Sequence, residues 1–249
     1  MAMLSCAQGQ FTFTTNNGTL TISGYSGSYT NLVIPSKTNG MSVVAIADYA
    51  LWDDGTHGML NVVIPNTITS IGVSAFQGNV WLKSVIIPNS VTYLGDNTFD
   101  YCASMTKAVI GAGVTNLNGS TFAQCYSLQS VYFLGNAQTN VGVFWNGSNV
   151  KVYYMPGKTG WSSIFAGTAA FLWNPQFLTD DGNFGIRTNR LGFTVAGTMN
   201  IPIALEVCTN LTNASWQQLQ TCTLTNGVLY LIDTNKANFP VRLYRINSP

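Results

Sequence analysis

The chain repeats itself with a period of 23 residues. Phe76, Phe99 and Phe122 stand at this spacing, and the residues around them repeat with them. A second column at the same step consists of Ile64, Ile87, Ile110 and Phe133. A unit this short cannot bury its own apolar face, so several copies must stack and share one core. The repeat therefore predicts a solenoid. Because stacked repeats present a long surface to a ligand, the repeat favours a binding protein rather than an enzyme.

Each unit contains one segment that is typical of a short strand. In Val85-Ile86-Ile87 the residues are β-branched, and Pro88 ends the segment. The spacing Leu82-x-x-Val85-x-Ile87 matches the strand half of a leucine-rich repeat. We expect the rest of the unit, with Val91, Leu94 and Phe99, to return along the opposite side and complete the core. The first unit is longer by about seven residues, because Ile34 precedes Ile64 by 30 positions.

Several motifs together carry a family resemblance. They are the run from Ile87-Pro88-Asn89-Ser90-Val91 to Phe99 and Cys102, the opening Thr14 to Tyr25, and Val152 to Trp161. Over roughly residues 10–175 the chain resembles BspA-type leucine-rich repeat proteins, which are secreted bacterial proteins. The resemblance implies a secreted or cell-surface protein used in adhesion or protein recognition, and it supplies no catalytic residues.

The ends of the chain differ from the repeats. Residues 1–9 are predicted to be a signal-peptide remnant, because Ala7-Gln8-Gly9 has small residues two apart, as a cleavage site needs. We expect cleavage near Gln10 and export; the alternative is a lipoprotein acylated at Cys6. Residues 176–249 alternate apolar and polar positions between turn signals, which predicts a small β-sandwich domain. This part resembles modules that end exported proteins of Verrucomicrobia-like bacteria. The predicted fold class is therefore mainly β: a leucine-rich repeat solenoid at 10–175, then a sandwich.

Composition excludes two classes of partner. Only 8% of the 249 residues are charged and the net charge is +1. No basic run is present to bind the phosphate backbone of a nucleic acid, so we predict no nucleic-acid partner. No apolar stretch approaches 18 residues, so no membrane span is predicted.

The cysteines allow two pairings. Cys102 and Cys125 share one column of adjacent repeats, so stacking brings them about 5 Å apart, within the range of a disulfide. A small buried thiol fits the same column, and we favour this interpretation. Cys208 and Cys222 flank a turn-rich stretch, and we expect them to form a disulfide across a hairpin. No Cys-x-x-Cys pair is present, so we expect no structural zinc site.

Catalytic motifs are nearly absent. His57 is the only histidine, and it lies between Trp52 and Gly58 beside Asp53 and Asp54. An acid–base or metal role for this loop is conceivable, but a polar loop formed by the insertion in the first repeat is the favoured interpretation. We therefore predict no catalytic residue, no metal and no cofactor.

The strand segments define the candidate binding surface. Alternate strand residues point away from the core and line the open side of a repeat protein. One outward column consists of Val33, Val63, Ile86, Val109, Tyr132 and Tyr153. Its polar flank consists of Asn31, Asn61, Ser84, Lys107, Ser130 and Lys151. Strand propensity alone accounts for the β-branched members; the two tyrosines favour recognition, since they combine contact area with a hydroxyl.

Two binding functions follow from this surface. The first is recognition of a protein partner, as in adhesion. The alternative is a carbohydrate-binding module in which aromatic rings stack on sugars, and its candidate residues are Tyr132, Tyr153, Trp145 and Trp161. We expect Trp161 and Trp173 instead to close the end of the solenoid, which favours the protein partner. A hydrolase that uses the His57 loop is a third possibility.

Overall fold

The computed structural model describes residues 10–27, 30–117, 119–138, 142–146, 149–187, 190–210, 212, 215–235 and 241–248. These residues form strands, turns and loops, with no helix among them. None of the described segments is therefore a helix long and apolar enough to cross a membrane. The chain divides into two compact units, Met1–Ala170 and Phe171–Pro249, and the sequence places the boundary at Pro175. The signal-peptide prediction for residues 1–9 lies outside the described residues.

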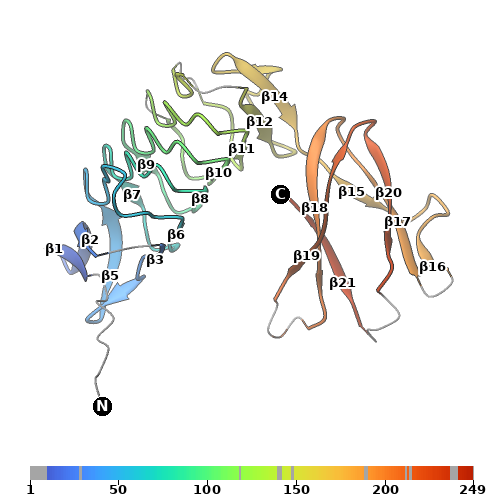
Figure 1. Ribbon diagram of the computed structural model, residues 1–249, viewed down its shortest axis with the longest axis horizontal. Helices are drawn as coiled ribbons and strands as arrows, with labels where there is room; N and C mark the ends of the chain where they lie inside the picture. Colours follow the sequence, from blue (N-terminus) through green and yellow to red (C-terminus); the bar gives the residue numbers. More distant parts are fainter. Residues whose placement is uncertain are drawn as a thin grey trace. The chain divides into compact units, whose positions relative to one another are not determined.

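The first unit is built on a long sheet of eight strands, in the order β13-β14-β12-β11-β10-β8-β6-β3 (Figure 1). Their bounds are β3 Asn31–Val33, β6 Asn61–Val63, β8 Ser84–Ile87, β10 Lys107–Ile110, β11 Ser130–Phe133, β12 Lys151–Tyr154, β13 Ile164–Phe165 and β14 Thr168–Leu172. Strands β8, β10, β11 and β12 pair in parallel, with Ser84, Lys107, Ser130 and Lys151 side by side. The repeat register predicted from the sequence is confirmed at these positions.

A second sheet forms on the return side of the coils, in the order β1-β2-β5-β7-β9 with β4 paired to β5. The bounds are β1 Gln10–Asn16, β2 Thr19–Ser26, β4 Lys37–Thr38, β5 Met41–Ile46, β7 Ser70–Ile71 and β9 Tyr93–Leu94. Ile46, Ile71 and Leu94 stand side by side in parallel register. Each coil therefore contributes a strand to one sheet, and the early coils contribute a short return strand to the other.

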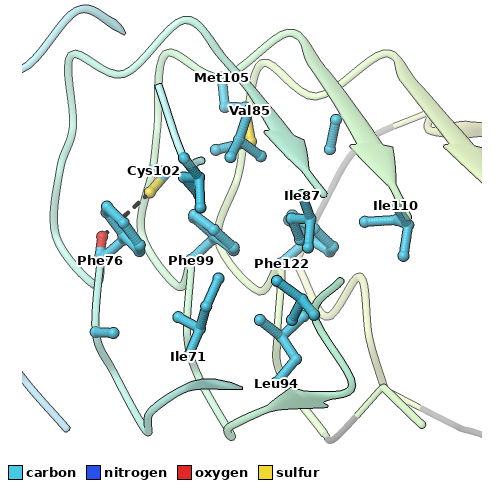
Figure 2. Close-up of a cluster of buried hydrophobic side chains, with 14 of the residues drawn as sticks. Ile71, Phe76, Val85, Ile87, Leu94, Phe99, Cys102, Met105, Ile110 and Phe122 are labelled. Carbon is cyan, nitrogen blue, oxygen red and sulfur yellow. Dashed lines mark hydrogen bonds between the residues drawn. The ribbon is translucent and has the colours of Figure 1, made fainter. Parts of the chain in front are cut away.

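Between the two sheets the column of phenylalanines is continuous (Figure 2). The rings of Phe76 and Phe99 stack with centroids 5.1 Å apart, and those of Phe99 and Phe122 with centroids 5.6 Å apart. Phe144 extends the stack by one coil, 6.3 Å from Phe122. Phe76, Phe99 and Phe122 are fully buried, as are the return residues Val91 and Leu94. The aromatic stack thus runs through the centre of the shared core, and Phe99 and Phe122 are each covered by a neighbouring ring on both faces.

Cys102 and Cys125 are free thiols, which confirms the favoured interpretation. Each Sγ donates to a main-chain carbonyl of the preceding coil: Cys102 to that of Phe76 (Figure 2), and Cys125 to that of Phe99. Burial raises the pKa of both thiols, to about 12 for Cys125. These cysteines therefore act as small buried hydrogen-bond donors.

The second unit contains two antiparallel sheets. One consists of β15 Gln176–Leu178, β16 Gly185–Arg187, β17 Arg190–Ala196 and β20 Val228–Asp233. The other consists of β18 Ile201–Cys208, β19 Gln217–Leu224 and β21 Leu243–Asn247. The rings of Phe193 and Tyr244 connect the sheets, with centroids 5.4 Å apart. The two sheets form the second unit, and their description as a β-sandwich stays a prediction.

The predicted disulfide between Cys208 and Cys222 is wrong, because both are free. In the register of the hairpin, Cys222 lies opposite Ile203, whereas Cys208 lies opposite Leu243 on the other neighbouring strand. The two positions, Ile203 and Cys208, are five steps apart along β18, roughly 17 Å at the rise of an extended strand. That separation is far beyond disulfide reach.

Candidate functional site

The strand face is the outward column from Val33 to Tyr153 with its polar flank, as defined above. Its register is as predicted, since Val33 lies beside Val63, Val109 beside both Ile86 and Tyr132, and Tyr132 beside Tyr153. Exposure changes along the column. Val33, Val63 and Ile86 are 65%, 56% and 64% exposed, and Val109 is half-buried. The apolar surface is therefore concentrated in the first three strands.

The two tyrosines are not exposed, and this corrects the expectation of an aromatic binding end. Tyr132 and Tyr153 are 1% and 2% exposed, and their rings stack with centroids 4.9 Å apart. Lys107 Nζ lies 5.4 Å from the centre of the Tyr132 ring, in cation–π geometry. Burial raises the pKa of both hydroxyls, to about 12 for Tyr153. Their stacking stabilises the face from within and leaves them no free ring face in this structure.

A hollow of about 260 Å³ opens on the exposed part of the strand face. Its walls include the side chains of Val63 and Ile86, with Asn61 and Ser84 at the polar side. Strands β6 and β8 pair at a single position, Asn61 opposite Ser84. The two strands consequently separate after this pair. Asn61 is held in place because its Nδ2 donates to Oδ1 of Asn31, 2.7 Å away.

The flanking positions also differ in exposure. Asn31, Asn61 and Lys151 are exposed, whereas Ser84, Lys107 and Ser130 are half-buried. A polar rim next to apolar side chains is typical of a protein-binding patch. The structure thus brings Asn61, Val63, Ser84 and Ile86 together at the hollow.

Trp161 closes the end of the repeats, as predicted. Its ring lies 5.0 Å from the centroids of both Phe133 and Tyr154, and 5.1 Å from Phe165. The second predicted cap, Trp173, belongs to the second unit, where its Nε1 donates to the carbonyl of Pro202. Of the four aromatic residues predicted for carbohydrate binding, only Trp145 is largely exposed, at 58%.

The His57 loop is held by a buried carboxylate. Asp53 is buried, and its carboxylate accepts hydrogen bonds from the backbone N–H groups of Thr56 and His57 and lies 2.8 Å from Nδ1 of His57. Asp53, Asp54 and His57 place possible metal-ligand atoms within 4.8 Å of one another. The hydrogen bonds account for Asp53 without a metal, because its carboxylate organises the loop. This geometry supports the polar loop predicted for the insertion.

Sequence reasoning missed a second surface, which we call the aromatic edge: Trp52, Trp81, Tyr101, Tyr126 and Trp145. These side chains are 44% to 58% exposed, and each follows the buried core-column residue of its coil by one to five positions. They occupy different positions within the unit, so aligning columns at a strict period does not reveal them. The signal was present in the sequence as at least one further aromatic residue within five positions of each core-column residue.

The coils, the shared core and the open strand face define a leucine-rich repeat solenoid. A model of the BspA type leucine-rich repeat region matches residues 44–169 in 6 copies, just over half of the chain. The chain belongs to the BspA-type leucine-rich repeat family, as its motifs predicted.

Solved structures of similar fold come from bacterial leucine-rich repeat proteins. One, from T. pallidum, is 21% identical over 59% of this chain and 84% of its own, with a TM-score of 0.47. One from Eubacterium ventriosum is 20% identical over 56% of this chain and 38% of its own, with a TM-score of 0.48. A leucine-rich cell surface protein from Faecalibacterium prausnitzii is 21% identical over 74% and 56%, with a TM-score of 0.42. No curated protein matches the chain.

Proposed function

We propose that this chain is a secreted or cell-surface binding protein that recognises a protein partner through the exposed part of its strand face. The observation that carries the proposal is the row of Val33, Val63 and Ile86, each more than half exposed on consecutive strands beside the hollow. Contiguous exposed apolar side chains with a polar rim mark interaction sites. The family to which the repeats belong supports a binding role and a position outside the cell.

The proposed site is smaller than the column predicted from the sequence. An apolar side chain of the partner fits the hollow between Val63 and Ile86, and amide or hydroxyl groups fit Asn61 and Ser84. Lys107, Ser130 and Lys151 continue the polar flank beyond it. We propose no catalysis at the His57 loop, since Asp53 and His57 satisfy each other within the loop.

A matched pair of isoleucines tests the proposal. Ile86 on the strand face and Ile186 in the second unit are both 64% exposed on strands, so replacing either by serine has a similar effect on stability. Binding to a panel of purified envelope and extracellular-matrix proteins is measured by biolayer interferometry. We expect Ile86→Ser to weaken binding to the partner by about tenfold, as for a central contact residue, and Ile186→Ser to leave it unchanged. Equal affinity of the two variants would reject the strand face.

A further inference from the structure

The aromatic edge is a continuous feature of five consecutive coils. The turns that carry the aromatic edge stack through backbone hydrogen bonds. In each bond an N–H group of one turn donates to a carbonyl of the next: Asp53 to Gln77, Gly78 to Asp100, Tyr101 to Ala123 and Gln124 to Trp145. Each turn follows one buried residue of the core column, which is Leu51, Phe76, Phe99, Phe122 or Phe144. Each of the five turns carries at least one exposed aromatic side chain, so exposed rings recur from coil to coil along the stacked turns.

Several of these rings are held in place by neighbouring coils. Trp81 Nε1 donates to the carbonyl of Gly55, 3.2 Å away, which fixes its indole against the His57 loop. Trp52 lies beside Gly78, where a Cβ atom would stand 3.8 Å from Nε1 of the indole. The rings of Tyr101 and Tyr126 meet edge to face, with centroids 6.2 Å apart. Rings that are already ordered lose less entropy when a ligand stacks on them.

Tyr101 occupies a backbone conformation that disfavours a bulky residue. Its φ is 58°, and the equivalent residue of the preceding coil is Gly78, with φ of 78°. A tyrosine in the left-handed region costs free energy that glycine avoids, and such residues concentrate at functional sites. Gln124, the equivalent residue of the next coil, has φ of 53°, so the left-handed conformation belongs to the turn itself. What favours a role in binding is that a half-exposed tyrosine stands at this position, where its ring adds little to the core.

The polar groups between the rings determine the kind of ligand. The five turns, residues 49–58, 76–82, 99–105, 122–128 and 144–146, contain no lysine or arginine. Asp54 is exposed, and the hydroxyl of Thr56 lowers the pKa of its carboxyl, so this group is an ionised acceptor. The amide of Gln77 donates to Asp100 in the next turn. Hydrogen-bond acceptors with no lysine or arginine among them disfavour anionic polymers, and they suit ligands whose hydroxyl groups donate hydrogen bonds.

We propose that the aromatic edge binds a neutral polysaccharide, whose sugar rings lie on the exposed aromatic faces while their hydroxyl groups donate to Asp54 and neighbouring acceptors. A polymer of repeated rings matches a protein surface on which exposed aromatic rings recur from coil to coil. The electron-rich faces of tryptophan and tyrosine attract the C–H groups of a sugar. This site is separate from the strand face and does not depend on its function.

Affinity electrophoresis tests the site with the full chain. Native gels contain hydroxyethylcellulose, glucomannan, laminarin or dextran, and parallel gels contain dextran sulfate or polylysine. We expect retardation by at least one neutral polysaccharide, and an affinity at least about tenfold weaker for Trp52→Ala combined with Trp81→Ala. Trp81→Phe keeps a ring and should retain part of the retardation. Tyr230→Ala, a 45% exposed aromatic of the second unit, and Ile86→Ser should bind like the wild type.

Three results would overturn the proposal. They are mobility unchanged in all four neutral gels, retardation by dextran sulfate or polylysine alone, and equal loss of retardation in Tyr230→Ala. Thermal unfolding of each variant verifies the fold, and Trp81→Phe serves as the binding test if the double variant unfolds. The Ile86→Ser control distinguishes the two proposals. This variant should lose binding to the protein partner and keep binding to the polysaccharide, whereas the tryptophan variants should do the opposite.

Discussion

Cys102 Sγ lies 3.4 Å from the carbonyl oxygen of Phe76, one coil earlier in the stack. Cys125 makes the same contact with Phe99 at 3.2 Å, and Nδ2 of Asn79 makes it with Leu51 at 2.8 Å. Three residues of one column thus satisfy carbonyl groups of the core column beside them. A buried carbonyl without a donor is costly, so the column requires a small side chain that can donate.

This relationship predicts that Asn79 is replaceable by cysteine but not by alanine. Asn79→Ala removes the side-chain donor from the carbonyl of Leu51 and one of two donors, the other being Cys102, from that of Phe76. It should lower the free energy of unfolding by about 1 to 3 kcal/mol. Asn79→Cys keeps a donor and also removes the buried Oδ1 of Asn79, which has no partner among the described residues. It should lie closer to the wild type in urea unfolding. Equal destabilisation by the two substitutions would show that the donor is irrelevant.

Phe99 is the middle ring of the core stack, and its removal should be among the most damaging single changes. We expect Phe99→Ala to lower the free energy of unfolding by about 3 to 5 kcal/mol, because it leaves a cavity between Phe76 and Phe122. The control is Phe184→Ala in the second unit, where the ring is 50% exposed and the expected change is within about 0.5 kcal/mol. Comparable losses in denaturant titrations would contradict the stacked core.

Stability should fall at alkaline pH because of the buried thiols. The unfolded chain loses the Cys125 proton near pH 9.0, whereas the folded chain keeps it to about pH 12. In this window the folded state binds more protons, so the free energy of unfolding decreases as pH rises, by up to about 1.4 kcal/mol per pH unit for this group. Urea titrations across the window measure the slope. Cys125→Ser does not titrate there and should show a shallower slope; an unchanged slope would assign the effect to other groups.

The buried ion pair between Asp233 and Arg242 should contribute more to the free energy of unfolding than the exposed pair between Glu206 and Arg245. Asp233 is fully buried, 2.6 Å from Nη1 of Arg242, and accepts a hydrogen bond from the Tyr244 hydroxyl at 2.7 Å. Asp233→Ala leaves Arg242 without this carboxylate, and should cost about 3 to 5 kcal/mol.

The matched control for that pair is Glu206→Ala, which removes the partner of the 45% exposed Arg245. We expect a cost of about 0 to 1 kcal/mol there, as for surface pairs. Calorimetry on both variants measures the difference. A smaller loss in Asp233→Ala than in Glu206→Ala would contradict the structural role of the buried pair.

Spacing alone predicted most of the solenoid. Counting residues per coil predicts three features of the solenoid. They are the register of Ser84, Lys107 and Ser130, the burial of Val91 and Leu94, and the shared column of Cys102 and Cys125. Counting succeeds because parallel coils of equal length must place equivalent residues side by side. The second unit has no such repeat, and the predicted pairing of Cys208 with Cys222 is wrong there, because hairpin register depends on turn geometry and Cys222 pairs opposite Ile203.

By itself, the sequence determined the coil, its apolar columns and the family, because the chemistry that drives stacking is local to each 23-residue unit. The tertiary structure decided which parts of those columns meet solvent. Val63 and Ile86 remain exposed, whereas Tyr132 and Tyr153 from the same column are buried. Exposure depends on what packs over a side chain, and the spacing within a unit carries no information on it. The aromatic edge likewise became visible only when the structure showed that the turns of Trp52, Trp81 and Tyr101 stack on one another and leave these side chains exposed.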